Sequence, residues 1–185
     1  DAEQAAPFMH SPKSIVRKLH LCTCGGGNLL LNVGPMPDGS IDKYTDETLT
    51  KVGDWLAVNG AATYGKKFRT GPVYSANTLT AVSADSDCKT FYLWNWVWPK
   101  NGELMFGGYM DAPTRVSLLA TGEELEFTYD GHRIFLKNLP KEIPDKLLGV
   151  TVIKMEFAEK PRHHFRSYYP QMCGGTDLSE GNHVW

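Results

Sequence analysis

An apolar run between two glycine-rich clusters constrains the fold of this chain more than any other feature. Gly25-Gly26-Gly27 precedes residues 28–33, and Gly34-Pro35 follows them. A continuous apolar run with turn residues at both ends is typical of a short strand buried on both faces, as in a parallel sheet. Such strands occur where helices cover both faces of a sheet, yet we find only one of them here. We therefore expect this strand to belong to a larger structure.

Helical patterns flank this strand on both sides. Ser11-Pro12 offers a hydroxyl N-cap and a proline at the first helical position, so we predict a helix over residues 12–23. A second helix is predicted from about residue 43 or 45 to residue 58. Four polar residues of the first helix are expected to face solvent: Lys13, Arg17, Lys18 and His20. The order helix, buried strand, loop and helix is typical of a parallel α/β sheet or barrel.

The pattern changes after Tyr64-Gly65 to short runs of aromatic and β-branched residues separated by turn dipeptides. Such runs favour antiparallel sheets, and their spacing predicts a β-sandwich. Asp130-Gly131 is the strongest hairpin signal. The predicted strands are residues 79–82, 90–97, 103–106, 114–119, 125–129, 134–136 and 150–157.

We therefore expect three parts. Residues 1–65 form an α/β remnant, residues 66–160 form an all-β antiparallel sandwich, and residues 161–185 form an irregular tail or the start of a further module. Residues 66–72 are basic and interrupted by Gly and Pro, which is typical of a linker.

Charge and cysteine content exclude several classes of function. The net charge of −2 provides no basic surface for nucleic acid or an anionic membrane, so neither is expected as a partner. The four cysteines are too scattered for a disulfide scaffold, and we expect buried free thiols. His163-His164, Cys173 and His183 match no strong metal-binding pattern, and we predict neither a metal site nor a cofactor.

Three tryptophans, Trp94, Trp96 and Trp98, alternate along one predicted strand. Exposed aromatic faces can stack on sugar rings, which would make this stripe a glycan platform. A stripe of period two more often fills a core or an interface between domains. The second interpretation is favoured, and the first is kept as an alternative.

Three ordered motifs carry a resemblance to a known family. They are Gly-Gly-Asn-Leu-Leu-Leu-Asn-Val-Gly-Pro at residues 26–35, Asp-Gly-Ser-Ile at 38–41, and Gly-Asp-Trp-Leu-Ala-Val-Asn-Gly-Ala-Ala-Thr-Tyr-Gly at 53–65. Together they closely resemble the retaining alpha-L-fucosidases, a family of glycoside hydrolases. The resemblance implies that residues 1–65 are the C-terminal end of a catalytic (β/α)8-like barrel, with residues 28–33 as its last strand. A C-terminal β-sandwich then follows.

The resemblance also implies a chemistry, namely removal of alpha-L-fucose from glycans by a retaining double displacement. That reaction needs an aspartate nucleophile and a second carboxylic acid/base. Both lie upstream of the last barrel strand in the family, so we expect no catalytic residue in this chain, and no activity from it alone. Surface solvation or helix capping is expected for the local carboxylates Asp38, Asp42, Asp46, Glu47 and Asp54.

A barrel strand delivers its C-terminal end to the active-site face. The expected substrate-binding residues are therefore Asn32, Gly34, Pro35 and Met36. The alternative is that they only shape the loop. The implied partners are a fucosylated glycan and the remainder of the barrel, in the same or another chain, and the implied location is extracytoplasmic: secreted, periplasmic or lysosomal. The competing function is a non-catalytic β-sandwich module that binds glycans or braces the barrel.

Overall fold

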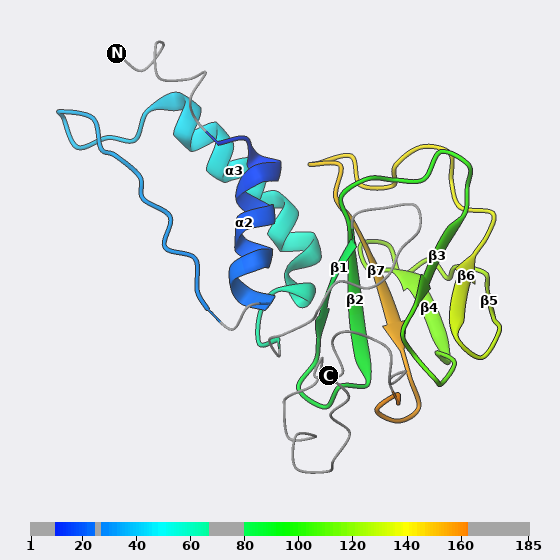
Figure 1. The fold of residues 1–185 in the computed structure, drawn as a ribbon. Coiled ribbons are helices and arrows are strands. Elements are labelled where there is room, and N and C mark those ends of the chain that lie inside the picture. The colour runs from blue at the N-terminus through cyan, green and yellow to red at the C-terminus, as the bar shows by residue number, and fades with distance from the viewer. Residues whose placement is uncertain (1–9, 25–26, 67–79, 163–185) are drawn as a thin grey trace.

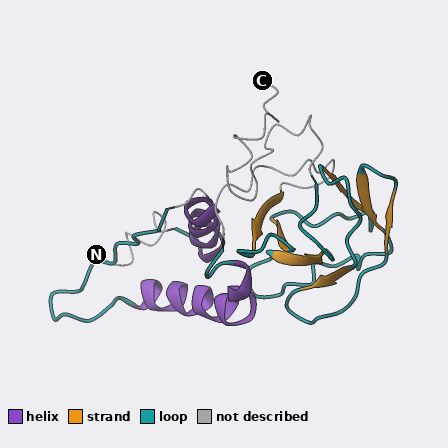
Figure 2. Ribbon diagram, turned by 90° about the horizontal axis from the view of Figure 1, so that it is seen from below, coloured by secondary structure: helices purple, strands orange, loops and turns teal. Residues whose placement is uncertain are grey.

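The computed structural model describes residues 10–24, 27–66 and 80–162. Within these ranges, helices α2 and α3 pack beside a β-rich region, as Figure 1 shows and Figure 2 shows from below. Helix α2 spans Pro12–Cys24, and helix α3 spans Lys43–Asn59 and continues into the short 3-10 helix η2, Gly60–Ala62. Both predicted helices are thus confirmed to within about one or two residues, the precision expected at helix ends.

In the described part of the chain, seven antiparallel strands make two sheets. The first sheet has the order β1-β2-β7-β4, and the second has the order β3-β6-β5. Each predicted strand overlaps one observed strand. The observed bounds are β1 Thr80–Ala84, β2 Thr90–Asn95, β3 Leu104–Gly107, β4 Arg115–Leu118, β5 Phe127–Tyr129, β6 Arg133–Leu136 and β7 Thr151–Glu156.

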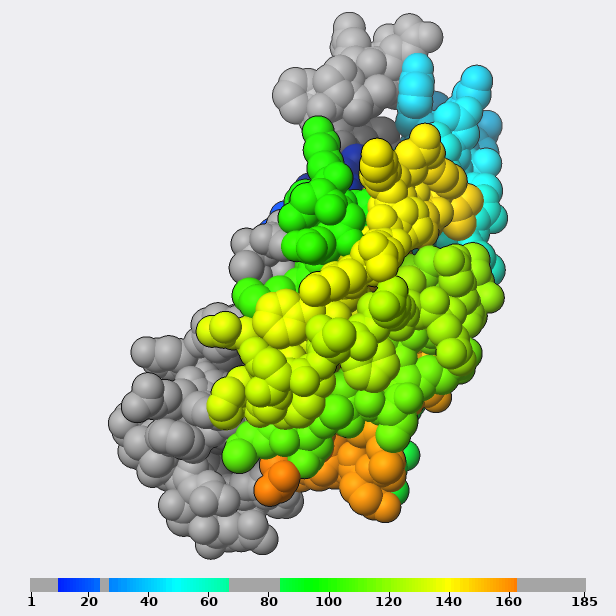
Figure 3. Space-filling view, turned by 90° about the vertical axis from the view of Figure 1, so that its right-hand side faces the viewer, coloured from blue at the N-terminus to red at the C-terminus, as the bar shows by residue number. Residues whose placement is uncertain are grey.

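Both sheets contribute to one apolar core. Phe91 and Ile153 from the first sheet are fully buried in the same cluster as Phe106 and Ile134 from the second. Figure 3 shows the chain around β5 and β6, in yellow and yellow-green, across one side of this region. Alternate residues of β2 and β7, such as Leu93 and Ile153, face this core. Tyr92, Trp94 and Val152, on the opposite face, belong to the cluster that includes the helices.

The Asp130-Gly131 hairpin is confirmed. Tyr129 of β5 lies opposite Ile134 of β6, and Gly131 adopts a φ of +94°, which favours glycine. The Asp130 carboxylate accepts hydrogen bonds from the backbone N–H groups of His132 and Arg133, at 2.9 and 2.7 Å. The turn is therefore held by its own side chain.

A second apolar cluster joins the helices to the first sheet. Val16 and Trp55 from the helices are completely buried with Trp94 of β2 and Val152 of β7. His20 was expected to face solvent, and that expectation is wrong, because its ring packs 4.2 Å from the ring of Trp94 and is 1% exposed. The sheet provides a second partner for α2 that helical periodicity alone does not reveal.

Residues 28–33 do not form the buried strand that the sequence predicts. They run as an extended loop outside the helices toward the start of α3 (Figure 1). Leu29 and Leu31 pack against the helix–sheet cluster, whereas Leu30 is 92% exposed. A parallel strand needs neighbouring strands to satisfy its backbone groups, and all paired strands of the described residues lie between residues 80 and 156.

The glycan-platform interpretation of the tryptophan stripe is wrong. Trp94, Trp96 and Trp98 are at most 8% exposed. The first two lie in the helix–sheet cluster, but Trp98 lies in the core between the sheets and donates its indole N–H to the carbonyl of Pro140 at 2.7 Å. The chain bends after Asn95, where β2 ends, so the two-residue alternation does not continue to Trp98.

The cysteines differ from the expected buried free thiols. Cys22 is a free thiol, as predicted, but it is half-buried rather than buried. Cys88 is disulfide-bonded, and its partner is not among the described side chains. Spacing along the chain cannot show which cysteines the fold brings together. Residues 163–185, including the His163-His164 pair, and residues 67–79 lie outside the described residues. No described helix has the length and apolar character needed to cross a bilayer.

Candidate functional site

The four predicted site residues lie together on the loop that leads to α3. Asn32, Gly34 and Pro35 are exposed, and Met36 is 39% exposed. The side chain of Asn32 makes no hydrogen bond to any described residue, which leaves its amide free to donate and accept. This loop therefore presents a polar amide and an apolar thioether to its surroundings. Both are suited to a sugar ring, which has hydroxyl edges and apolar faces.

A tight turn fixes the end of this loop. The backbone N–H of Met36 donates to the carbonyl of Ser40 at 2.7 Å, and the N–H of Gly39 donates to the carbonyl of Met36 at 2.8 Å. Gly39 has a φ of +85°, so a residue with a side chain would be strained there. The turn thus sets the direction of the chain at Met36 and supports the loop-shaping interpretation of this residue.

Asp38 serves the turn. Its carboxylate accepts hydrogen bonds from the side chain of Ser40 at 2.7 Å and from the backbone N–H of the same residue at 3.0 Å. These bonds lower the pKa of Asp38 below its ordinary value. A carboxylic acid that is ionised so readily is a poor proton donor near neutral pH.

Asp42 caps helix α3. It accepts a hydrogen bond from the backbone N–H of Thr45 at 3.0 Å and another from the Thr45 hydroxyl. The bonds from Thr45 lower the pKa of Asp42. Asp46 and Asp54 are exposed, and Glu47 forms an exposed pair with Lys43. Capping and solvation account for all five local carboxylates, as the sequence predicts. Within the described ranges, no three side chains are grouped as a metal site would require.

The sequence does not reveal the polar contacts that join the helices to the sheets. Lys13 of α2 donates to the carbonyls of Trp96 and Gly149, each at 3.0 Å. Lys13 was expected to face solvent, and this is wrong, because its ammonium group is held in part-buried contacts with these two carbonyls. Both acceptors lie in loops more than 80 residues away along the chain. Only the folded chain brings them together.

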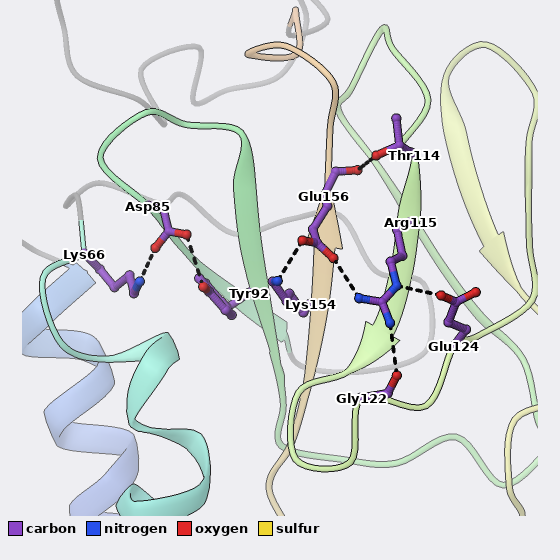
Figure 4. A network of polar contacts seen from close by, with 9 residues as sticks. All are labelled: Lys66, Asp85, Tyr92, Thr114, Arg115, Gly122, Glu124, Lys154 and Glu156. Carbon is purple, nitrogen blue, oxygen red and sulfur yellow. Dashed lines mark hydrogen bonds and ion pairs between the residues drawn. The ribbon is translucent and has the colours of Figure 1, made fainter.

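A polar network continues across the same face of the first sheet, beyond the helices (Figure 4). Lys66 pairs with Asp85 and lies 4.7 Å from the ring centre of Tyr92. The Tyr92 hydroxyl hydrogen-bonds Asp85 at 3.2 Å. Burial and the Asp85 charge raise the pKa of Tyr92 well above its ordinary value.

The rest of the network centres on Glu156, which accepts from Lys154 at 2.7 Å and from Arg115 at 3.4 Å. Arg115 also donates to Glu124 at 2.7 Å. All these charges are paired, so this part of the face is a structural surface rather than a binding site.

Comparison with known proteins agrees with the resemblance seen in the sequence. The family model "Alpha-L-fucosidase" matches residues 3–61, which include the candidate loop. The tissue alpha-L-fucosidase of Mus musculus is 33% identical over 145 residues, which is 78% of this chain. The chain belongs to the alpha-L-fucosidase family. The human tissue alpha-L-fucosidase is 32% identical over 134 residues, or 72% of the chain.

Solved alpha-fucosidases share the fold. The crystal structure of Thermotoga maritima alpha-fucosidase in complex with fucose has a TM-score of 0.70 and 26% identity, and the match covers 81% of this chain and 35% of that one. A share this large includes residues from both the helical and the β-rich parts. The chain spans 30% of the mouse alpha-L-fucosidase and 27% of the human one.

Proposed function

We propose that this chain is part of a glycoside hydrolase that removes alpha-L-fucose from glycans. The observation that carries the proposal is the family match over residues 3–61, which includes the exposed loop at Asn32 and Met36. Fucosidases matching about four fifths of the chain in fold support the same assignment. The substrate would be a fucosylated glycan, bound by the whole enzyme.

In this proposal residues 1–65 complete a (β/α)8-like barrel. Residues 28–33 are already extended, and Leu29 and Leu31 pack against the helix–sheet cluster while Leu30 is exposed. With a neighbouring strand on each side, this segment would become a buried strand of the barrel. We assign residues 66–160 to a β-sandwich and residues 161–185 to a tail or further module. The remainder of the barrel would come from a longer form of this protein or from another chain.

The catalytic carboxylates would lie outside this chain. The carboxylates near the candidate loop cap a turn or a helix, or stand in solvent. A retaining glycosidase needs two carboxyl groups about 5 to 5.5 Å apart across the scissile bond, one nucleophile and one acid/base. The whole enzyme tests this mechanism: if it retains configuration, the first product seen by NMR is alpha-L-fucose, whereas first formation of the beta anomer would exclude retention.

The contribution of this chain to the active site would be the loop at Asn32, Gly34, Pro35 and Met36. A barrel strand presents its C-terminal end to the substrate, which is where these residues follow residues 28–33. In the whole enzyme, Asn32→Ala should lower kcat/KM on an aryl alpha-L-fucoside by more than about threefold, since it removes hydrogen-bonding capacity. Asn101→Ala in an exposed turn of the β-rich region is the control. A smaller loss for Asn32→Ala removes this residue from the site.

The second candidate function is bracing. The helices and the first sheet share a core that includes Trp55 and Trp94, and Lys13 and Lys66 add polar links. A β-rich region fixed in this way would hold the last helix of the barrel in place. Burial of the tryptophan stripe leaves the glycan-binding form of this alternative without its platform.

An extracytoplasmic location fits the proposal. One group of relatives carries the name plasma alpha-L-fucosidase, including those of Rattus norvegicus and Homo sapiens. The disulfide at Cys88 points the same way, because disulfides persist in oxidising compartments. Expression with and without reductant tests this: loss of the folded state on reduction is expected for a secreted or lysosomal protein.

A further inference from the structure

Cys88 lies in the turn between β1 and β2, at one end of the core between the sheets. Its side chain is 3% exposed and belongs to the same cluster as Phe91 and Phe157. Its sulfur is bonded to that of another cysteine. The chain has four cysteines, and Cys22 is a free thiol. The partner of Cys88 is therefore either Cys24 or Cys173.

Cys24 ends helix α2, which lies on the other face of the first sheet. The helix packs there through Val16 and through His20, whose ring contacts Trp94. Figure 1 shows α2 on the opposite side of β1 and β2 from the second sheet. Stacked layers lie about 10 Å apart, whereas a disulfide joins Cα atoms that are usually about 4.4 to 6.8 Å apart. A sulfur in the core between the sheets is thus out of reach of α2.

The chain that follows β7 passes along the turn that contains Cys88. The backbone N–H of Phe157 donates to the carbonyl of Lys89 at 2.8 Å. The Lys89 ammonium group donates to the carbonyl of Ala158 at 3.3 Å and pairs with Glu159 at 2.8 Å. The segment that leads to the C-terminus is therefore fixed beside the residue next to Cys88.

Arg162 marks the point from which the rest of the chain starts. Its guanidinium group pairs with Asp111 at 2.7 Å. Tyr109, two residues before Asp111, has its ring centre 5.2 Å from that of Phe157, so Arg162 lies at the same end of the core as Cys88. Residues 163–173 provide eleven residues of chain, which can span up to about 36 Å when extended. This length is ample for a return to the turn.

We propose that Cys88 forms its disulfide with Cys173, which attaches the C-terminal segment to the end of the core between the sheets. Forming the bond oxidises two thiols, with loss of two protons and two electrons. A small-molecule disulfide such as oxidised glutathione accepts both and is reduced to two thiols. Because Cys88 is buried, attacking thiolates have little access to its sulfur, so the bond is a structural crosslink rather than a redox switch. The proposal does not depend on the activity of the whole enzyme.

The test is peptide mapping of the 185-residue chain, secreted from eukaryotic cells and digested with trypsin without reductant after its free thiols are blocked. Cleavage after Lys and Arg places Cys88 in the peptide 70–89 and Cys173 in the peptide 167–185. Mass spectrometry should find these two peptides joined, and reductant should separate them. The proposal is overturned if the peptide 70–89 is joined instead to the peptide 19–43, which contains Cys24, or if it carries a free thiol.

Thiol counts in denaturant give a second, independent measurement. Cys173→Ser should expose one more thiol than the parent, because Cys88 loses its partner. Cys24→Ser is the matched control and should expose one fewer, because it removes a thiol that is free in the parent. The opposite pair of results would assign the disulfide to Cys24 and overturn the proposal.

The same variants show whether the crosslink stabilises the fold. Closing the loop between residues 88 and 173 restricts the unfolded chain, so reductant should lower the melting temperature of the parent by about 5 to 10 °C. Cys24→Ser should respond as the parent does, and Cys173→Ser should not respond to reductant. An equal response of Cys173→Ser and the parent would contradict the proposal.

Discussion

Trp55 of α3 donates its indole N–H to the backbone carbonyl of Val150, 3.1 Å away, across the boundary between the helices and the first sheet. Both residues are completely buried, and the Trp55 ring also lies 5.1 Å from that of Trp94. The helical and β-rich parts therefore share a core rather than meeting at a wet surface. We expect them to unfold in one transition, because neither buries these groups alone.

Replacing Trp55 by Phe tests this link. Phe preserves most of the apolar contact but leaves the Val150 carbonyl without its donor, so the free energy of unfolding should fall by about 1 to 3 kcal/mol. Urea unfolding followed by circular dichroism measures it. Tyr44→Phe, at an exposed position of α3, should change stability by less than about 0.5 kcal/mol. Two separate transitions in the parent chain would contradict the shared core.

The Lys66–Asp85 ion pair gives a second prediction. The Lys66 side chain is 10% exposed and that of Asp85 32%, so Lys66→Met leaves a partly buried carboxylate without its partner. The free energy of unfolding should fall by about 2 kcal/mol, less than for a fully buried pair. Lys51→Met, on the exposed side of α3, is the control. Equal melting temperatures for the two variants would show that this pair contributes nothing.

His20 makes the stability depend on pH. Burial against Trp94 lowers the pKa of His20 from 6.5 to about 4 in the folded chain. As the pH falls, His20 therefore takes up a proton near pH 6.5 in the unfolded chain but only near pH 4 in the folded chain. This contribution is complete above pH 6.5 and is lost as the pH falls toward 4, by up to about 3 kcal/mol.

His20→Phe isolates this effect, since Phe fills the site and does not titrate. Asp38 and Asp42, whose pKa values are lowered, also lose stability in acid, but they do so in both proteins. Denaturant unfolding at about pH 7.5 and about pH 4.5 gives the difference, and the variant should lose less on acidification. Equal losses of stability in the parent and in His20→Phe would mean that His20 takes up its proton without leaving the core.

The sequence predicts helices and strands better than it predicts which of them pack against one another. The helices and the seven strands follow from periodicity and turn residues such as Asp130-Gly131, because these are local properties. Burial of His20 and the contacts of Lys13 depend on a sheet that follows more than 60 residues later. The prediction of a buried strand at residues 28–33 failed because burial requires neighbouring strands that the described residues do not supply.

The candidate loop was found because its motif is continuous along the chain. The polar links between the helices and the β-rich region were not found, since Lys13, Trp96 and Gly149 come from three separate segments. No periodicity joins them. Contacts between distant segments require the structure.

Thr63→Val should stabilise the chain. The substitution removes a buried hydroxyl that has no partner and keeps a β-branched side chain of similar shape, so the free energy of unfolding should rise by about 1 kcal/mol. Thermal unfolding measures it, with Thr128→Val as the exposed comparison. A decrease in stability would show that the hydroxyl has a hydrogen-bond partner in the folded chain.

The most direct test of the central claim is the release of nitrophenol from an aryl alpha-L-fucoside. The 185-residue chain is assayed alone and then joined to the remainder of the proposed barrel. We predict no hydrolysis by the chain alone, because its local carboxylates are used for capping or lie in solvent, and hydrolysis by the joined protein. Hydrolysis by the purified chain alone would contradict the account, since the catalytic carboxylates would then have to be its own.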